Sequence, residues 1–242
     1  MKNNIKEEFI STLSHEIRTP LTSIKGFSQT MLSSWDKIDD NKKKDFLNII
    51  LGQSQRLINL VENVLNVARI DSDSNDLVLT KVNAEILLKN CIDVVNINYK
   101  DFVFNFNKPK NELYCYIDSN KTQQILINIL DNSAKYSNNS KTIDVNLYNK
   151  GDFNVFSIKN YGSCIENSEI PHIFEKFYRV DSYIHSTTQG SGLGLYIANN
   201  LTRKMQGHIE VKSDKESLVT EFLVYLPVYE VEKITKCIKQ ES

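Results

Sequence analysis

Apolar residues recur every three or four positions through the first third of the chain, which is the spacing of one face of an α-helix. One series runs from Ile10 to Met31 and, after a polar break at residues 35–41, a second runs from Phe46 to Val67. The pattern predicts two long helices joined by a short turn, an antiparallel hairpin with one apolar side. Because two helices alone bury little apolar surface, we expect two chains to pair their hairpins into a homodimeric four-helix bundle. Packing of the hairpin on the rest of its own chain is the alternative.

The periodicity changes after a polar run at residues 72–76, which predicts a linker between two domains, residues 1–71 and 77–229. In the second domain, alternating runs predict strands at 78–82, 102–106, 113–117, 142–148, 153–159, 208–212 and 220–225, and helical periods predict helices at 84–95, 119–136 and 192–205. This order indicates a two-layer α/β sandwich with a mixed sheet. Residues 230–242 form a predicted C-terminal tail with a short helix.

Composition and charge exclude several classes of protein. The 242 residues are 40% hydrophobic and 24% charged, which suits a globular protein. A formal net charge of −1 gives no electrostatic reason to expect nucleic acid as a partner. The four cysteines have no zinc-like spacing and indicate no disulfide framework, which fits a reducing compartment. No stretch approaches the roughly 20 apolar residues that span a bilayer, so we expect a soluble chain.

The first candidate for chemistry is His15. It lies on the side of the first predicted helix that faces away from the apolar positions, so its imidazole is expected to point to water. Glu16 is adjacent and could orient or deprotonate the imidazole, and Thr19 lies one turn further along the same face. An exposed histidine is more often inert than reactive, but these neighbours favour a reactive one.

The run from Phe9 to Leu21, FISTLSHEIRTPL, resembles the phosphoacceptor box of sensor histidine kinases, the ATP-dependent half of two-component signalling. The resemblance implies that His15 accepts the γ-phosphoryl group of ATP and that Glu16 is its acid/base partner. It also implies that Thr19 helps to position water when the same domain dephosphorylates a response regulator.

A second motif is the predicted helical run from Asn128 to Tyr136. Asn128 and Asn132 lie one turn apart on one helix face, so their amide oxygens could bind one hard cation. Lys135 lies about one more turn along the helix. The run resembles the N box of the same kinases and of the wider ATPase superfamily that shares the Bergerat nucleotide fold. The resemblance implies that Asn132 ligates Mg²⁺ with support from Asn128. It further implies that Lys135 and Tyr136 contact the nucleotide.

A third motif is the glycine-rich run Gly190-Ser191-Gly192-Leu193-Gly194 at the start of a predicted helix. Backbone N–H groups there can close on an anion, and the helix dipole adds attraction. The run lacks the Lys-Ser/Thr of a Walker A loop and the glycine spacing of a dinucleotide fold. It resembles the second glycine box of histidine kinases, which implies that Gly190, Gly192, Leu193 and Gly194 hold the triphosphate.

The irregular stretch at residues 160–189 is far longer than an ordinary connection and is typical of a functional lid. Its run from Ile173 to Arg179 resembles the F box of the family. We expect the aromatic residues of this run, Phe177 among them, to pack the lid down at the nucleotide site. The resemblance makes Arg179 the candidate for stabilising charge on the γ-phosphate during transfer.

The first glycine box of the family is Asp-x-Gly-x-Gly, whose carboxylate accepts a hydrogen bond from the adenine amino group. This chain has Asn160, Gly162 and Cys164 at these positions. Asn160 keeps an acceptor oxygen but loses the charge, so we expect ATP binding to weaken about tenfold rather than to be lost. An amide can also donate a hydrogen bond, which predicts weaker discrimination between adenine and guanine. Thr220 is expected to line the same base pocket.

The resemblance covers about residues 5–228 and implies a kinase that uses ATP and Mg²⁺, phosphorylates His15 and passes the group to an aspartate of a response regulator receiver domain. We expect a cytoplasmic location, with any membrane contact made through a sensor region absent from this chain. Two alternatives are a kinase-impaired regulator phosphatase, because of Asn160 and Cys164, and a dimeric docking module. The intact asparagines and glycines of the nucleotide motifs argue against the docking module.

Overall fold

The computed structural model describes residues 2–71, 77–180 and 192–229. The chain divides into two compact units, residues 1–72 and 73–242, each with its own fold. Within the described residues, no helix is both long enough and apolar enough to cross a membrane. The predicted linker at 72–76, the predicted tail at 230–242, and Gly190 and Ser191 of the glycine-rich run lie outside the described residues.

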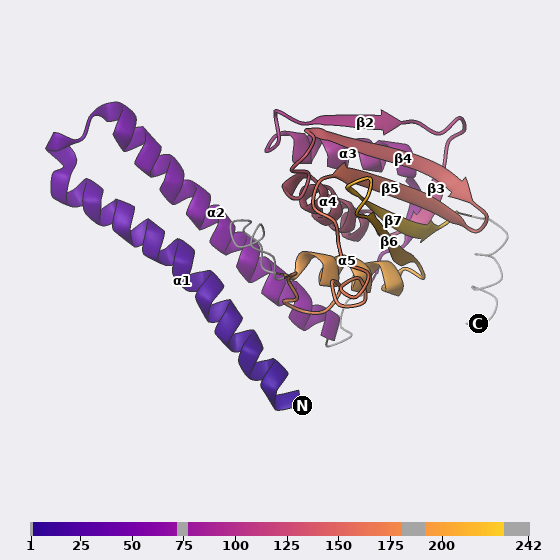
Figure 1. The fold of residues 1–242 in the computed structure, drawn as a ribbon, viewed down its shortest axis with the longest axis horizontal. Helices are drawn as coiled ribbons and strands as arrows, with labels where there is room; N and C mark the ends of the chain where they lie inside the picture. Colours follow the sequence, from indigo (N-terminus) through magenta and orange to yellow (C-terminus); the bar gives the residue numbers. More distant parts are fainter. Residues whose placement is uncertain (1, 72–76, 181–191, 230–242) are drawn as a thin grey trace. The chain divides into compact units, whose positions relative to one another are not determined.

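The first unit is the predicted helical hairpin (Figure 1). Helix α1 (Lys2–Ser34) and helix α2 (Asp40–Asp71) lie side by side and are joined by the short 3₁₀ helix η1 (Trp35–Lys37). The carboxylate of Asp39 accepts a hydrogen bond of 3.0 Å from the backbone N–H of Lys42, so Asp39 caps the start of α2. Near the turn the rings of Phe27 and Phe46 pack with their centroids 5.0 Å apart, which joins the two helices.

The second unit is built on a mixed five-stranded sheet with strand order β2-β4-β5-β7-β6. Strands β2 (Val103–Asn107) and β4 (Thr142–Lys150) pair in parallel, and every other pair in this sheet is antiparallel. The remaining strands of this sheet are β5 (Phe153–Tyr161), β7 (Val219–Pro227) and β6 (His208–Asp214). Strands β1 (Thr80–Asn83) and β3 (Tyr114–Ile117) form a separate antiparallel pair.

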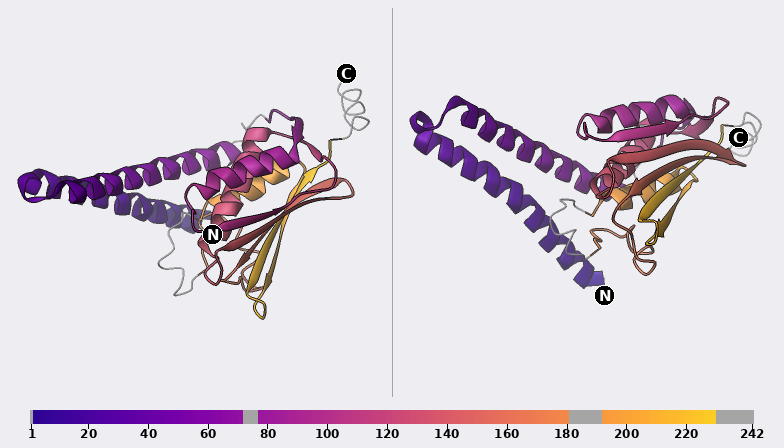
Figure 2. Two further views of the ribbon diagram at one scale, coloured as in Figure 1. Left: turned by 90° about the horizontal axis from the view of Figure 1, so that it is seen from above. Right: turned by 45° about the horizontal axis from the view of Figure 1, so that its top comes forward.

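Helices α3 (Ala84–Asn96), α4 (Ser119–Lys135) and α5 (Gly194–Lys204) cover one face of the sheet (Figures 1 and 2). The core lies between these two layers. Its fully buried side chains include Ile125, Ile129, Ile143, Val145, Phe156, Ile158, Ile197 and Val224. The predicted cap of α4 is confirmed, because Asp118 accepts a hydrogen bond of 3.0 Å from the N–H of Lys121. The predicted two-layer α/β sandwich is therefore confirmed.

The opposite face of the sheet is polar where β2 and β4 meet. Asn105 donates to Asp144 at 2.9 Å and Asn107 donates to Asn146 at 2.8 Å, so paired side chains form a short ladder across the two parallel strands. The edge of the sheet formed by β2 and β4 is therefore polar on this face, whereas Val155, Leu223 and Tyr225 form a small apolar cluster further along it, on β5 and β7.

The structure moves some predicted boundaries by a few residues. The hairpin strands β4 and β5 each extend two residues beyond prediction, and a two-residue turn at Gly151 and Asp152 joins them. Gly151 has a φ of 63°, the left-handed conformation that such tight turns require. The helix predicted from residue 192 begins at Gly194 instead, because Gly192 has a φ of 65° and cannot take part in a right-handed helix.

Candidate functional site

The candidate residues of the first unit gather on one turn of α1. His15 is exposed, as predicted from its position opposite the apolar seam. Thr19 is also exposed, and its hydroxyl donates a hydrogen bond of 3.1 Å to the backbone carbonyl of His15. This bond fixes the threonine side chain one turn from the imidazole. The structure thus presents His15 and Thr19 together on a solvent-accessible surface.

Glu16 contacts a residue that sequence reasoning missed. Its carboxylate forms an ion pair of 3.1 Å with Arg56 of α2, and both side chains are largely buried. The second guanidinium nitrogen of Arg56, Nη1, is buried and has no hydrogen-bond partner among the described residues. The ion pair therefore fixes the carboxylate beside His15 from the opposite helix. The only feature of the sequence that could have indicated this partner is the position of Arg56, an arginine on the inward-facing side of α2.

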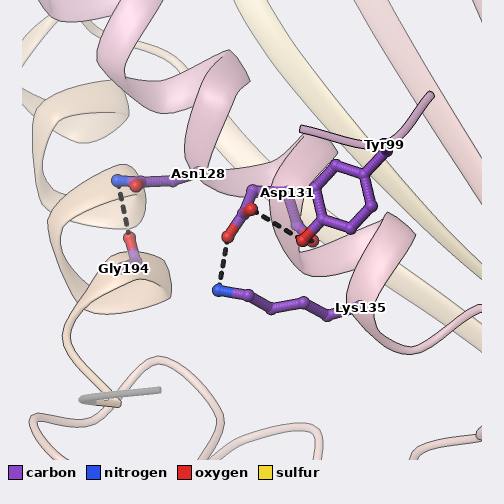
Figure 3. Close-up of polar contacts among 5 residues, drawn as sticks. All are labelled: Tyr99, Asn128, Asp131, Lys135 and Gly194. Carbon is purple, nitrogen blue, oxygen red and sulfur yellow. Dashed lines mark hydrogen bonds and ion pairs between the residues drawn. The ribbon is translucent and has the colours of Figure 1, made fainter. Parts of the chain in front are cut away.

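In the second unit, the asparagine motif and the glycine-rich motif are joined by a hydrogen bond. The amide nitrogen of Asn128 on α4 donates to the carbonyl oxygen of Gly194 at the start of α5, at 3.3 Å (Figure 3). Because Gly194 follows the glycine-rich turn, this bond fixes the start of α5 against α4. Asn128 and the glycine motif, which lie 66 residues apart, are brought together.

Lys135 is engaged by an acidic residue that the sequence analysis did not single out. Its ammonium pairs with the carboxylate of Asp131 one turn earlier on α4, and Tyr99 donates a hydrogen bond of 2.9 Å to the same carboxylate (Figure 3). Burial, and secondly the charge of Asp131, raise the pKa of the Tyr99 hydroxyl well above its usual value. Asp131 thus positions Lys135, the residue expected to contact the nucleotide.

The residues expected to form the base pocket lie where the end of β5 meets the segment that follows α4. Gly162 approaches the segment that follows α4 so closely that an added Cβ would lie 2.5 Å from the carbonyl oxygen of Tyr136 and closer still to the nitrogen of Asn138. Thr220 on the neighbouring strand β7 is buried, and its hydroxyl donates a hydrogen bond of 3.2 Å to the carbonyl of Ser163. Strands β5 and β7 therefore bring Asn160, Gly162 and Thr220 to one place.

Cys164 stands where the family has the last glycine of its first glycine box. Its side chain is partly buried, and its thiol donates a hydrogen bond of 3.1 Å to the carbonyl of Asp214 at the end of β6. The sulfur therefore ties the start of the following loop to the sheet edge, which a glycine would not do.

The described part of the predicted lid is tied back to the glycine motif. Phe177 has a φ of 63°, which is uncommon for a bulky residue, and its N–H donates a hydrogen bond of 3.1 Å to the carbonyl of Gly192. A Cβ on Gly192 would lie 2.7 Å from the backbone carbon of Phe177, so only glycine fits there. Leu193 is fully buried and Arg179 is partly buried. Phe177 and Gly192 thus lie together, whereas Gly190 is outside the described residues.

Asn132 is the sequence-predicted magnesium ligand. It is partly buried on α4, and no other described residue forms a hydrogen bond with its side-chain amide. Within the described residues, no group of three or more His, Cys, Asp or Glu side chains could hold a metal ion. An amide oxygen is a hard donor that suits Mg²⁺, which commonly takes few protein ligands and completes its shell with phosphates and water. Asn132 therefore fits such an ion.

Two family profiles match the chain. Residues 5–73 match the His Kinase A (phospho-acceptor) domain, and residues 117–230 match the profile described as Histidine kinase-, DNA gyrase B-, and HSP90-like ATPase. The first match contains the exposed His15, and the second contains the asparagine and glycine motifs that the bond from Asn128 to Gly194 joins.

Curated relatives and solved structures agree with these matches. The chain is 30% identical over 232 residues to Sensor protein SrrB of Staphylococcus aureus, covering 93% of this chain and 38% of that protein. It is 28% identical over 209 residues to Sensor protein KdpD of Clostridium acetobutylicum, covering 86% of this chain and 23% of that protein. The chain thus spans well under half the length of these relatives.

Among solved structures, the histidine kinase AdeS of Acinetobacter baumannii has a TM-score of 0.67 at 19% identity and covers 89% of this chain and 98% of its own. The histidine kinase ThkA in complex with the response regulator TrrA has a TM-score of 0.69 at 22% identity, covering 94% of this chain and 63% of that one. Both solved structures share the fold of this chain. A hairpin with an exposed histidine followed by an ATPase-type unit is the domain pairing of sensor histidine kinases, the ATP-dependent protein kinases of two-component signalling, and this chain belongs to that family.

Proposed function

We propose that this chain transfers the γ-phosphoryl group of ATP to His15 and then to an aspartate of a response regulator receiver domain. The observation that carries the proposal is the exposure of His15, beside Glu16 and Thr19, in the unit that matches the phosphoacceptor profile. A nucleophile must be reachable by its substrate and needs a nearby proton acceptor. The turn of α1 that bears His15 meets both requirements.

In the proposed step, an imidazole nitrogen of His15 forms a bond to the γ-phosphorus while the bond from that phosphorus to its bridging oxygen breaks. ADP leaves with the electron pair of the broken bond, and the imidazole proton passes to the carboxylate of Glu16. Arg179 and the N–H groups of the glycine motif offset negative charge on the phosphates. Arg56 supports this step by holding Glu16 in place.

Mg²⁺, when bound, neutralises charge on the phosphates of ATP. We assign Asn132 as its protein ligand. The amide nitrogen of Asn128 is committed to Gly194, so we assign Asn128 the role of fixing the glycine motif beside the metal-binding residue. This supporting role agrees with the one that the family resemblance implies.

The proposed homodimer is supported by an apolar stripe on α2. The stripe consists of exposed large residues at heptad-like spacing, namely Leu47, Leu51, Ile58, Val61 and Leu65. Leu51 is 68% exposed within the single chain, although the inward face of α2 packs on α1. A second hairpin would cover this stripe and complete a four-helix bundle.

Charged residues in the stripe should dissociate the dimer. We expect the double variant Leu51→Glu and Ile58→Glu to weaken dimerisation by about 100-fold or more, because each carboxylate would be desolvated against apolar neighbours. Asn48→Glu is the matched control, since Asn48 is exposed and lies about 100° around the helix from Leu47. Sedimentation equilibrium measures the effect. A wild-type monomer, or a double variant that dimerises as tightly as the control, would refute the assignment.

The transfer to a response regulator and a phosphatase activity are further parts of the proposal. In the solved ThkA structure the kinase is in complex with the response regulator TrrA, which supports a receiver domain as the partner here. The exposed hydroxyl of Thr19 is suited to position water for dephosphorylation of that partner. Because ATP and receiver domains are cytoplasmic, we place both reactions in the cytoplasm.

A kinase-impaired phosphatase is the alternative function. It is favoured by Asn160 and Cys164, which stand in place of the family's aspartate and glycine.

Two labelled forms of ATP test the proposed function. Purified chain should take up label from γ-labelled ATP in the presence of Mg²⁺, and should take up none from α-labelled ATP, because only the terminal phosphoryl group is transferred. Removal of Mg²⁺ with EDTA should suppress the uptake. A folded, dimeric chain that binds ATP but takes up no γ-label would instead support the phosphatase alternative.

A further inference from the structure

Asn160 is a buried amide whose nitrogen has no hydrogen-bond acceptor among the described residues. The residue lies in β5 and is only 1% exposed. Backbone polar groups and side-chain amides that are buried in this way are nearly always paired, so each exception requires an explanation. The position of the amide in the fold supplies one.

The sheet register directs Asn160 toward the helices. Its cross-strand partners are Ile143 on β4 and Thr220 on β7, and both are buried on the helix-covered face. The neighbouring residue Lys159 pairs with Asp144 and Glu221, so it lies on the opposite face. Asn160 is thus on the same side of the sheet as α4, which carries Asn128 and Asn132.

The polar cross-strand partner of Asn160, Thr220, is hydrogen-bonded to other residues. The hydroxyl of Thr220 contacts the carbonyl of Ser163 at 3.2 Å and the hydroxyl of Ser213 at 3.0 Å. The next residue on this face of the chain is Gly162, whose tight approach to α4 leaves no room for a side chain. The amide nitrogen is therefore left without an acceptor among the described residues, and a bound molecule could supply one.

We propose that Asn160 reads the Watson–Crick edge of the purine and accepts guanine as well as adenine, so that GTP is a second phosphoryl donor. This inference rests on the proposed function, because it concerns the nucleotide of the same site. Adenine offers an amino donor beside a ring-nitrogen acceptor, whereas guanine offers a carbonyl acceptor beside a ring N–H donor. A carboxamide has one donor and one acceptor, and a half-turn about its last bond exchanges them. Asn160 can therefore pair with either base.

A carboxylate at this position would discriminate between the bases. It has acceptors only, so at the 6-position of the purine it accepts a hydrogen bond from the amino group of adenine but meets the carbonyl oxygen of guanine, whereas an amide can turn its NH₂ group toward that oxygen. Asn160→Asp keeps the shape of the side chain, replaces the amide donor by a second acceptor oxygen and adds a negative charge at a buried position. The variant is therefore expected to restore selectivity for ATP.

Competition against a fluorescent ATP analogue, with Mg²⁺ and the full chain, tests the proposal. We expect the Kd of GTP to be within about tenfold of the Kd of ATP for the wild type, and this ratio to rise by about thirtyfold or more in Asn160→Asp. Asn146→Asp makes the same chemical change on the polar face of the sheet, where Asn146 accepts from Asn107, and should leave the ratio unchanged. Inosine triphosphate, whose base has the 6-carbonyl and the ring N–H of guanine but lacks its 2-amino group, should bind to the wild type as GTP does, and this measurement needs no variant.

The outcomes separate this inference from the proposed function. Wild-type chain that binds ATP but neither GTP nor inosine triphosphate at millimolar concentration would overturn the inference and leave the proposed function standing. The same ratio in wild type and in a folded Asn160→Asp chain would also overturn it. Binding of both nucleotides without uptake of γ-label would support the recognition of both bases by Asn160, but it would refute GTP as a phosphoryl donor together with the kinase.

Discussion

A chain with His15→Ala will take up no phosphoryl group from ATP, although it will bind nucleotide and dimerise like the wild type. The substitution removes the only nucleophile in the proposed step, so label uptake should fall by about a thousandfold or more. His15 is exposed on α1, and its side chain is not needed for the packing of the hairpin. The loss should therefore be specific to phosphoryl transfer. Quantified label uptake and nucleotide affinity, measured on the same samples, check both halves of this expectation.

Thr22→Ala provides the matched control. Thr22 is exposed and lies two turns beyond His15 on nearly the same face of α1, so its loss makes a similar change to the helix surface. This variant should take up label at the wild-type rate. If His15→Ala kept substantial label, another residue would be the acceptor and the assignment of His15 would be wrong.

The second large effect is expected at Gly162. Gly162→Ala would push a methyl group into the backbone of residues 136–138 at the end of α4. Because backbone atoms cannot move aside as a flexible side chain can, we expect the second unit to lose about 2 to 4 kcal/mol of unfolding free energy. The same shift would displace Asn160 and the end of α4, so nucleotide affinity should fall sharply. Scanning calorimetry and nucleotide titration on the full chain measure the two effects.

Gly52→Ala is the control for a glycine without close neighbours. Gly52 lies in the interior of α2, and an added Cβ there would meet no atom within 4 Å. Alanine favours a helix over glycine, so this variant should be more stable by about 1 kcal/mol and should bind nucleotide normally. Equal stability of Gly162→Ala and the wild type would show that the contact between β5 and α4 yields easily, contrary to this account.

The hairpin and the layered second unit could be predicted from the sequence because their signals are local. Apolar spacing alone identifies α1 and α2, and alternation identifies β4 and β5. A motif such as the glycine-rich run is equally local, since its residues are adjacent in the chain. The resemblance to histidine kinases then supplied roles for individual residues, which no periodicity indicates.

The contacts that position those residues could not be predicted in the same way. Arg56 reaches Glu16 across 40 residues, and Tyr99 reaches Asp131 across 32 residues. Such contacts depend on the angle at which two helices pack and on the length of a loop, neither of which is encoded in a short pattern. The unpaired amide of Asn160 likewise became visible only when the register of β5 placed it on the helix-covered face.

Peptide mapping of the phosphorylated wild-type chain tests the central claim, phosphorylation of His15, most directly. After incubation with γ-labelled ATP and Mg²⁺, digestion should give one labelled peptide, and that peptide should contain His15. The label should be lost in acid and retained in base, as expected for a phosphorus–nitrogen bond. An acid-stable label, a label on another peptide, or no label on a dimeric chain that binds ATP would contradict the account.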